Sequence, residues 1–239
     1  LGSYAERRLV ASKQLVKIPK QISDEQAAAA MLKGCTVQYL IRRTYPVKTG
    51  DTVLFHAAAG GCGLIACQWL KHLGVTVIGT VGTQEKAELA RAHGCDHAII
   101  YTQENFVERV KELTDGKGVP VVYDSVGKDT FEDSLACLQP RGLMVSFGNA
   151  SGAVEPIMPA ILAAKGSLFL TRPTLASYIS TREELNATAA DLFDVVATGS
   201  VKVEIGQVFS LRDAAQAHQD LEARKTTGST VLLMEDEKS

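Results

Sequence analysis

The chain has 239 residues, of which 46% are hydrophobic and 22% are charged, and its formal net charge is -2 at pH 7. This length and composition predict a folded protein with a substantial core, made of one large domain or of one domain and part of another. The near-neutral charge provides no broad positive field, so it excludes binding to nucleic acid or anionic membranes through bulk electrostatics. We therefore expect a protein that acts on small molecules.

Cysteine usage and the start of the chain indicate the cellular context. The five cysteines are scattered without a CxxC pair, at Cys35, Cys62, Cys67, Cys95 and Cys137. This pattern is typical of neither a disulfide framework nor a zinc cluster, and it favours a reducing, cytoplasmic environment. No apolar run approaches membrane-spanning length. The start at Leu1 has neither a signal-peptide pattern nor an initiator methionine, so we expect the chain to begin within a longer protein.

The first 50 residues predict two extended segments and a helix. Residues 4–10 and 15–18 are expected to be extended, as remnants of a β-rich unit. Ser23, with Gln26 three residues later, forms a capping-box pattern that predicts a helix start. Gly34 is a candidate break within that helix.

From Thr52 onward, short apolar runs alternate with helical stretches. The runs cover residues 53–55, 75–78, 98–100, 119–123, 143–147 and 167–171. Such strands suit a parallel sheet covered by helices on both faces. The alternation predicts a doubly wound parallel α/β domain, the Rossmann arrangement, with strand order 3-2-1-4-5-6. Beyond it we expect a helix over residues 181–198, a strand near 201–205, a helix over 211–224 and a final strand over 230–233.

A glycine-rich turn follows the first predicted strand. Residues 57–63 read AAAGGCG, which is GxGxxG with Ala58 in place of the first glycine. Gly60 would let the backbone approach a pyrophosphate, and Gly63 would let helix and strand pack closely. The alternative is that these glycines serve only a tight turn. The position of the motif between a strand and a helix, at the start of repeated βαβ units, favours dinucleotide binding.

The end of the second predicted strand bears on the choice of nucleotide. NAD-binding domains place an acid about 20 residues after the turn, and the strand tip here has none. Glu85 falls in the first turn of the next helix, where it favours the helix dipole. Gly82 leaves room for a 2′-phosphate, Thr83 can donate a hydrogen bond, and Lys86 is a counter-charge. We therefore predict NADPH over NADH, while an ordinary solvated lysine stays the alternative for Lys86.

Four stretches carry a family resemblance, and they read MLKGCTVQYL (residues 31–40), FHAAAGGCG (55–63), YDSVG (123–127) and SFGNASG (146–152). In this order they resemble the quinone oxidoreductases of the zeta-crystallin type in the medium-chain dehydrogenase/reductase superfamily. The resemblance covers essentially the whole chain. It implies an NADPH-dependent enzyme that transfers a hydride to a quinone without a metal, and a catalytic domain that is incomplete at its N-terminus.

The resemblance also implies roles for individual residues. It groups Tyr101 and Arg224 with Lys86 and Gly82 around the adenosine 2′-phosphate. Tyr39 and Thr36 are its candidates near the nicotinamide, and no catalytic residue is assigned. The other implied cofactor contacts are Gly60, Gly61, Cys62, Gly63, Thr83, Ser125, Phe147, Gly148, Asn149 and Arg172. From the residues alone, Tyr39 fits a helix core and Gly148 a turn.

The expected domain organisation follows from the same patterns. We predict a remnant of the catalytic domain over residues 1–35, a dinucleotide-binding domain over 36–175 and a C-terminal segment over 176–239 that returns to the catalytic domain. A polypeptide that starts at Leu1 would lack one side of the nicotinamide cleft, so little or no turnover is expected of it. The apolar edge strand over residues 167–171 predicts a homodimer, in line with the resemblance.

The sequence leaves two alternatives to quinone reduction open and argues against others. An activated alkene, such as an enone or alkenal, stays open as the acceptor, and so does a non-catalytic, crystallin-like role in NADPH binding. Ser125 lacks a G-x-S-x-G elbow, which argues against a hydrolase. His56 is expected to be structural. Cys35 is misplaced for a zinc ligand, and no residue set has ligand spacing. We expect neither nucleic acid nor a membrane as a partner.

Overall fold

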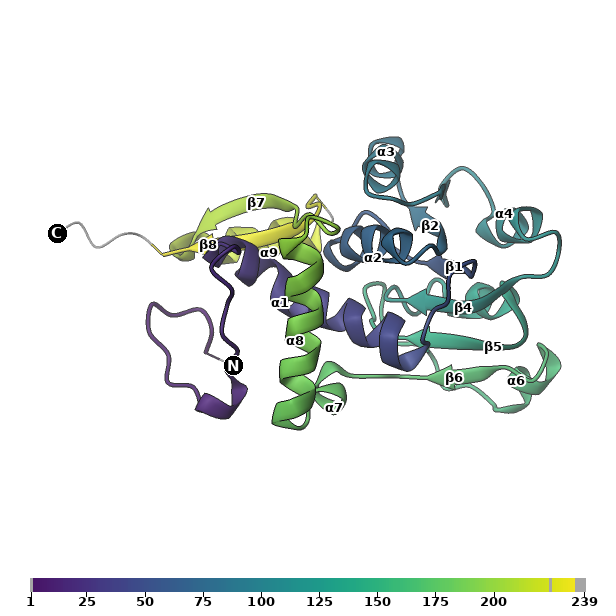
Figure 1. Ribbon diagram of the computed structural model, residues 1–239. Helices are drawn as coiled ribbons and strands as arrows, with labels where there is room; N and C mark the ends of the chain where they lie inside the picture. Colours follow the sequence, from purple (N-terminus) through teal and green to yellow (C-terminus); the bar gives the residue numbers. More distant parts are fainter. Residues whose placement is uncertain (1, 224, 235–239) are drawn as a thin grey trace.

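A parallel sheet forms the centre of the computed structural model, which describes residues 2–223 and 225–234 (Figure 1). Its six strands lie in the order β3-β2-β1-β4-β5-β6. They are β1 (Thr52–Phe55), β2 (Thr76–Val81), β3 (His97–Ile100), β4 (Val119–Asp124), β5 (Leu138–Ser146) and β6 (Phe169–Thr171). All neighbours pair in parallel. The predicted doubly wound fold and its strand order are therefore confirmed.

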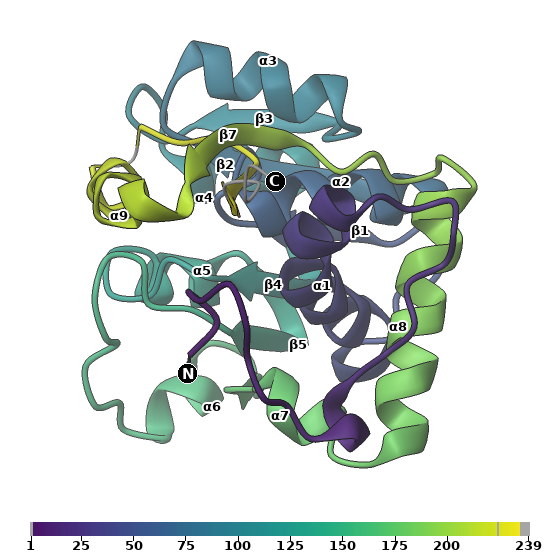
Figure 2. The ribbon, with the colours of Figure 1, turned by 90° about the vertical axis from the view of Figure 1, so that its left-hand side faces the viewer.

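Helices cover both faces of this sheet, as a fully parallel sheet requires. The α-helices of the described residues are α1 (Asp24–Tyr39), α2 (Gly61–His72), α3 (Gln84–Ala92), α4 (Phe106–Leu113), α5 (Phe131–Ala136), α6 (Ala160–Ala164), α7 (Leu175–Tyr178), α8 (Arg182–Ala197) and α9 (Ala214–Glu222), of which α9 packs against β7 and not against this sheet. Alternating strand residues divide the core: Val53 and Phe55 pack with α1, α2 and α3, whereas Leu54 packs with α4 and α5. Helix α8 lies against α1 (Figure 2).

Helix α1 begins as predicted but is not broken. Ser23 and Gln26 form the capping box. The helix runs through Gly34 and passes into a π-helical turn over Leu40–Thr44. A Cβ on Gly34 would lie 2.4 Å from Leu192 Cδ1 of α8. The glycine therefore permits close helix packing and does not break the helix.

The irregular parts differ from expectation in two places. Residues 2–51 contain no strand, and Leu9 there is fully exposed, so the two segments predicted as extended have no described partner strand. The strand expected near residues 201–205 begins later, as β7 (Ile205–Ser210), which pairs with β8 (Ser229–Leu233) in a separate two-stranded sheet. Val201 instead closes α8, because its N–H donates to Val195 O at 2.9 Å.

The predicted domain boundaries fall within helices. The boundary between residues 35 and 36 lies in α1, and that between residues 175 and 176 lies in α7. The division into domains stays a prediction.

Candidate functional site

The candidate residues lie where the parallel strands end. Each strand in order β1 to β6 is followed by one or more of them, namely the turn at Gly60, then Gly82, Tyr101, Ser125, Phe147 and Arg172. Open α/β sheets bind ligands outside the carboxyl ends of their strands, where the strand order reverses. That reversal occurs here between β1 and β4. The sheet therefore presents one continuous edge for a dinucleotide.

The glycine turn forms a cradle at the start of α2. Gly60 is the N-cap of α2, and Gly61, Cys62 and Gly63 make its first turn. Such first-turn N–H groups have no partner within the helix, and the dipole adds positive charge. A Cβ on Gly63 would lie 2.4 Å from Ala57 O, so the helix approaches the strand as closely as glycine allows. These features fit a bound pyrophosphate.

Tyr101 covers Gly82 at the tip of β2. A Cβ on Gly82 would lie 2.9 Å from the Tyr101 hydroxyl, and Tyr101 itself is half exposed. Thr83 caps α3, with its hydroxyl accepting from the Lys86 N–H at 3.3 Å. The structure thus brings four predicted phosphate-site residues together. Arg224, the fifth, lies outside the described residues.

Glu85 occupies the first turn of α3, as expected, and is exposed. A hydrogen bond from Thr83 and the local backbone hold the pKa of this carboxyl below its usual value. The Thr83 side chain is therefore engaged in capping the N-terminus of α3. Glu85 belongs to that start and not to the strand tip, where an NAD-type acid would lie.

Tyr39, a predicted nicotinamide-side residue, forms an aromatic pair with Tyr178. Their rings stack with centroids 4.4 Å apart, and Tyr39 is buried. Burial raises the pKa of Tyr39 to about 12, with Cys62 and Tyr178 adding to the rise and Arg172 opposing it. The phenol is therefore neutral at physiological pH. Thr36 lies one turn earlier on α1, and its hydroxyl donates to Leu32 O at 2.8 Å.

The loops after β4 and β5 lie against each other. A Cβ on Gly148 would lie 2.5 Å from Ser125 O, so only glycine permits this approach. Phe147 N–H donates to Asp124 O at 2.8 Å, and Gly152 N–H donates to Asn149 O at 3.1 Å. Ser125, Phe147, Gly148 and Asn149 are thereby brought together. Their contacts to a cofactor stay a prediction.

A buried polar network that sequence reasoning missed begins at His56. This side chain is fully buried. Its Nδ1 lies 2.8 Å from Thr80 Oγ1, and its Nε2 lies 2.9 Å from Ser134 Oγ. Both ring nitrogens are engaged, which agrees with the expected structural role of His56. Spacing along the chain gives no signal for this contact, because Ser134 is 78 residues away.

The network continues from Ser134 to the loop after β4. Ser134 Oγ donates to Asp124 Oδ2 at 3.2 Å, and Thr130 Oγ1 donates to the same oxygen at 2.8 Å. The other oxygen, Asp124 Oδ1, accepts from the N–H groups of Val126 and Gly127. This buried carboxylate therefore fixes the loop that holds Ser125.

The state of His56 makes stability depend on pH. Burial lowers the pKa of His56 below 6.5, and the charge of Asp124 opposes this in part. Below its ordinary pKa the unfolded chain binds a proton that the folded chain does not, so stability is full above about pH 6.5 and falls as the pH drops. The slope for one proton is at most about 1.4 kcal/mol per pH unit.

Urea unfolding of His56→Gln at pH 7.5 and pH 5.5 checks this. We expect the variant to be less stable than wild type at pH 7.5 but to lose less stability on acidification. His72→Gln, at an exposed histidine, should keep the full wild-type loss. An equal loss in wild type and His56→Gln would contradict the assignment.

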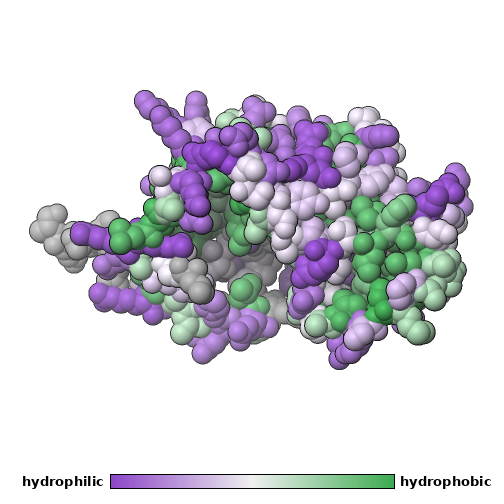
Figure 3. Space-filling model, turned by 90° about the horizontal axis from the view of Figure 1, so that it is seen from below, coloured by the Kyte–Doolittle hydropathy of each residue, from purple (hydrophilic) through white to green (hydrophobic). Residues whose placement is uncertain are grey.

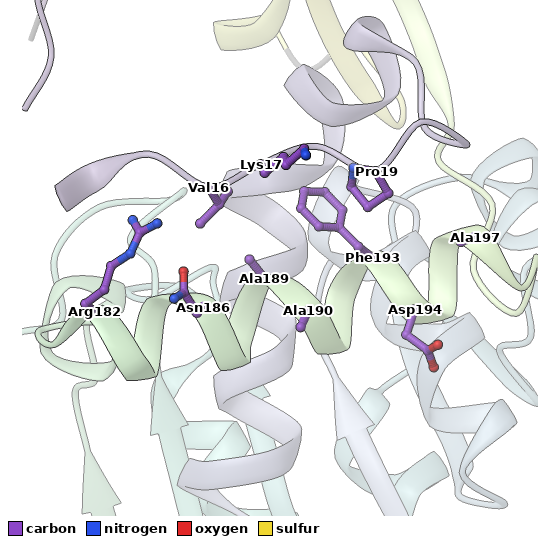
Figure 4. A pocket seen from close by; sticks show the side chains of 10 residues that line it. All are labelled: Val16, Lys17, Pro19, Arg182, Asn186, Ala189, Ala190, Phe193, Asp194 and Ala197. Atoms are coloured by element: carbon purple, nitrogen blue, oxygen red, sulfur yellow. The ribbon is translucent and has the colours of Figure 1, made fainter. Parts of the chain in front are cut away.

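A cavity of about 480 Å³ lies away from the strand ends (Figure 4). It lies between residues 16–19 and α8, and Val16, Pro19, Ala189 and Phe193 line it. None of the predicted cofactor residues lines this cavity. It is therefore distinct from the glycine turn.

Comparisons with known proteins agree with this geometry. Residues 61–194 match the family described as zinc-binding dehydrogenase. A quinone oxidoreductase of Pseudomonas aeruginosa is 59% identical over 233 residues, which are 98% of this chain and 72% of that protein. A 2-haloacrylate reductase of Burkholderia sp is 50% identical over 236 residues, covering 98% of this chain and 71% of that protein.

A solved structure is similar as well. The Escherichia coli quinone oxidoreductase, complexed with NADPH, superposes with a TM-score of 0.89 at 55% sequence identity. The match covers 91% of this chain and 68% of that one.

Within residues 2–223 and 225–234, no three His, Cys, Asp or Glu side chains are grouped to hold a metal ion. Metal-free chemistry stays a prediction. In that part of the chain, no helix combines the length and apolar character needed to cross a membrane.

Proposed function

Because the chain belongs to the quinone oxidoreductases within the zinc-binding dehydrogenase family, we infer that it is an NADPH-dependent oxidoreductase that transfers a hydride to a quinone. One observation carries this inference. The glycine turn that opens α2 lies beside a strand tip without an acid, where Tyr101 covers Gly82. The turn suits a pyrophosphate and the tip suits a 2′-phosphate.

Different residues along the strand ends bind different parts of the cofactor. Bound NADPH supplies the hydride from its nicotinamide C4. The N–H groups of the α2 start hold the pyrophosphate, and Gly82, Lys86 and Tyr101 recognise the 2′-phosphate. The neutral phenol of Tyr39, stacked on Tyr178, makes the nicotinamide side aromatic and helps to exclude water. A quinone takes its proton from solvent, so this chemistry requires no dedicated acid.

An activated alkene is the second candidate acceptor. The 50% identity to a 2-haloacrylate reductase favours it, because that relative is named for a substrate with a conjugated double bond. Such an alkene needs the same features as a quinone, namely an open cleft beside the nicotinamide.

The rate of NADPH oxidation distinguishes these acceptors. The purified intact protein, with any residues that precede Leu1, is mixed with NADPH and with a quinone, a 2-haloacrylate, an enone or no acceptor, and each reaction is repeated with NADH. We expect the quinone with NADPH to give the fastest oxidation. If NADPH is oxidised with the alkenes but not with the quinone, the acceptor is an activated alkene. No oxidation above the acceptor-free rate with any acceptor would contradict an oxidoreductase.

We also propose a homodimer that joins the β6 edges of two copies. Phe169 of β6 is 61% exposed and Leu170 is 37% exposed, although both are apolar. Figure 3, seen from below the view of Figure 1, shows apolar side chains gathered on the part of this face where β6 and α6 lie. An unpaired apolar edge strand requires cover, and a two-fold mate would continue the sheet.

Light scattering at micromolar concentration tests the dimer. Wild type should be dimeric and Phe169→Lys should shift to monomer, because a charge replaces the apolar contact. Leu221→Lys is the matched control, since Leu221 is also 56% exposed but lies on α9. A monomeric wild type would contradict the proposal.

The cytoplasm is the proposed location. Cys35, Cys62, Cys67, Cys95 and Cys137 are all free thiols, which a reducing compartment maintains. Cell fractionation tests this location.

A further inference from the structure

A lysine of α1 lies across the glycine turn. A Cβ on Gly61 would lie 2.6 Å from Lys33 Nζ, so the ammonium group passes directly over the first residue of α2. Nζ donates to Ser229 Oγ at 2.9 Å and to Gly228 O at 3.4 Å. Ser229 in turn donates to Ala29 O at 3.0 Å. The lysine is therefore held in place from β8.

The positive charge of Lys33 has no paired negative charge among the described residues. The side chain is partly buried, and this burial lowers its pKa from the usual value. The positive end of the α2 dipole lies beside it. Among the described residues, no carboxylate forms an ion pair with Lys33, and two of its three N–H donors are used. A half-buried cation beside a helix N-terminus is stabilised when an anion lies next to both.

The start of β8 holds the turn and the lysine together. Gly228 forms an isolated parallel bridge with Gly60, the N-cap of α2. The same Gly228 accepts from Lys33 through its carbonyl oxygen. The orientation of Lys33 over the turn is thus fixed before any ligand binds, which reduces the ordering cost of binding.

Building on the proposed function, we propose that Lys33 is a further cofactor-binding residue, whose ammonium donates to a pyrophosphate oxygen of the dinucleotide while Ser229 positions it. This role differs from that of Lys86. A 2′-phosphate contact affects NADPH only, whereas NADPH and NADH both carry the pyrophosphate. Lys33 therefore contributes affinity without cofactor preference.

Calorimetric titration of Lys33→Met with NADPH and with NADH tests the proposal. Methionine keeps an unbranched apolar stem and removes the charge, and Ser229 retains its bond to Ala29 O. We expect both dissociation constants to rise by about tenfold, and by the same factor. Lys117→Met is the control. Lys117 is exposed and precedes β4, so it lies at the amino-terminal ends of the strands, opposite the glycine turn. Its dissociation constants should match wild type.

The outcomes separate this proposal from the proposed function. If folded Lys33→Met binds both nucleotides like wild type, the role of Lys33 is wrong while NADPH binding by wild type still stands. A loss for NADPH alone would also overturn it, because Lys33 would then contact the 2′-phosphate. Wild type that binds neither nucleotide would overturn the proposed function itself.

A second variant covers the case in which Lys33→Met does not fold. Lys33→Arg keeps the positive charge and is checked by thermal unfolding. Its affinities for both nucleotides should stay within about threefold of wild type. A tenfold loss for a folded Lys33→Arg would overturn the proposal.

Discussion

Gly63→Ala is expected to destabilise the protein by about 3 kcal/mol or more. The new Cβ would lie 2.4 Å from Ala57 O and 2.5 Å from the carbonyl carbon of Ala58. These backbone atoms cannot move aside easily, because Ala58 N–H is bonded to Thr80 O at 3.0 Å within the sheet region. Helix α2 would have to leave the strand, and nucleotide binding at its start would be lost with it.

Gly61→Ala is the matched control for this change. Its Cβ would meet only the outer atoms of the Lys33 side chain, which can move aside by giving up the hydrogen bonds to Ser229 and Gly228, whereas the backbone beside Gly63 cannot. We expect its loss of stability to stay below about 1 kcal/mol. Urea unfolding of the two variants beside wild type gives both values. Equal losses would show that Gly63 is not required for close packing of α2 on the strand.

Gly82→Asp is expected to reverse the cofactor preference. The carboxylate would repel the 2′-phosphate, offer an acceptor to the ribose hydroxyls and displace the Tyr101 hydroxyl. Together these effects should weaken NADPH by about 100-fold, or about 2.7 kcal/mol, and leave NADH equal or tighter.

Gly82→Asn separates charge from size in that experiment. It has nearly the same shape as aspartate, so it displaces Tyr101 equally but carries no charge. Titrations should give an NADPH affinity between those of wild type and Gly82→Asp. If both variants weaken NADPH alike, the effect is steric and the electrostatic explanation is wrong.

Local patterns predicted most of the fold because they match the periodicities of the elements. The apolar runs after Thr52 correspond to β1 through β6, and even the strand order followed from the doubly wound rule. The role of Gly34 could not be predicted from a local pattern. A glycine inside a helix reads as a break, but its role depends on Leu192, 158 residues later, which no local pattern reveals.

The site could be predicted in part for the same reason. Gly82 and the glycine turn follow directly from strand ends, so spacing locates them. Tyr178 could not be found, because α7 has only four residues and no period. For Lys33 the sequence offers one signal: it precedes Thr36 by three residues on α1, so both lie on one helix face. The His56 to Asp124 network joins three strand ends and one helix, and only the folded chain brings them together.

Calorimetric titration of wild type and Lys86→Ala with NADPH and NADH tests the central claim most directly. Lys86 lies in the first turn of α3, which follows Gly82, and each charge-assisted bond to a phosphate contributes about 1.5–3 kcal/mol. Wild type should bind NADPH more tightly than NADH, and Lys86→Ala should weaken NADPH by about tenfold while leaving NADH unchanged. Equal wild-type affinity for the two nucleotides, or a variant that weakens both alike, would contradict the account.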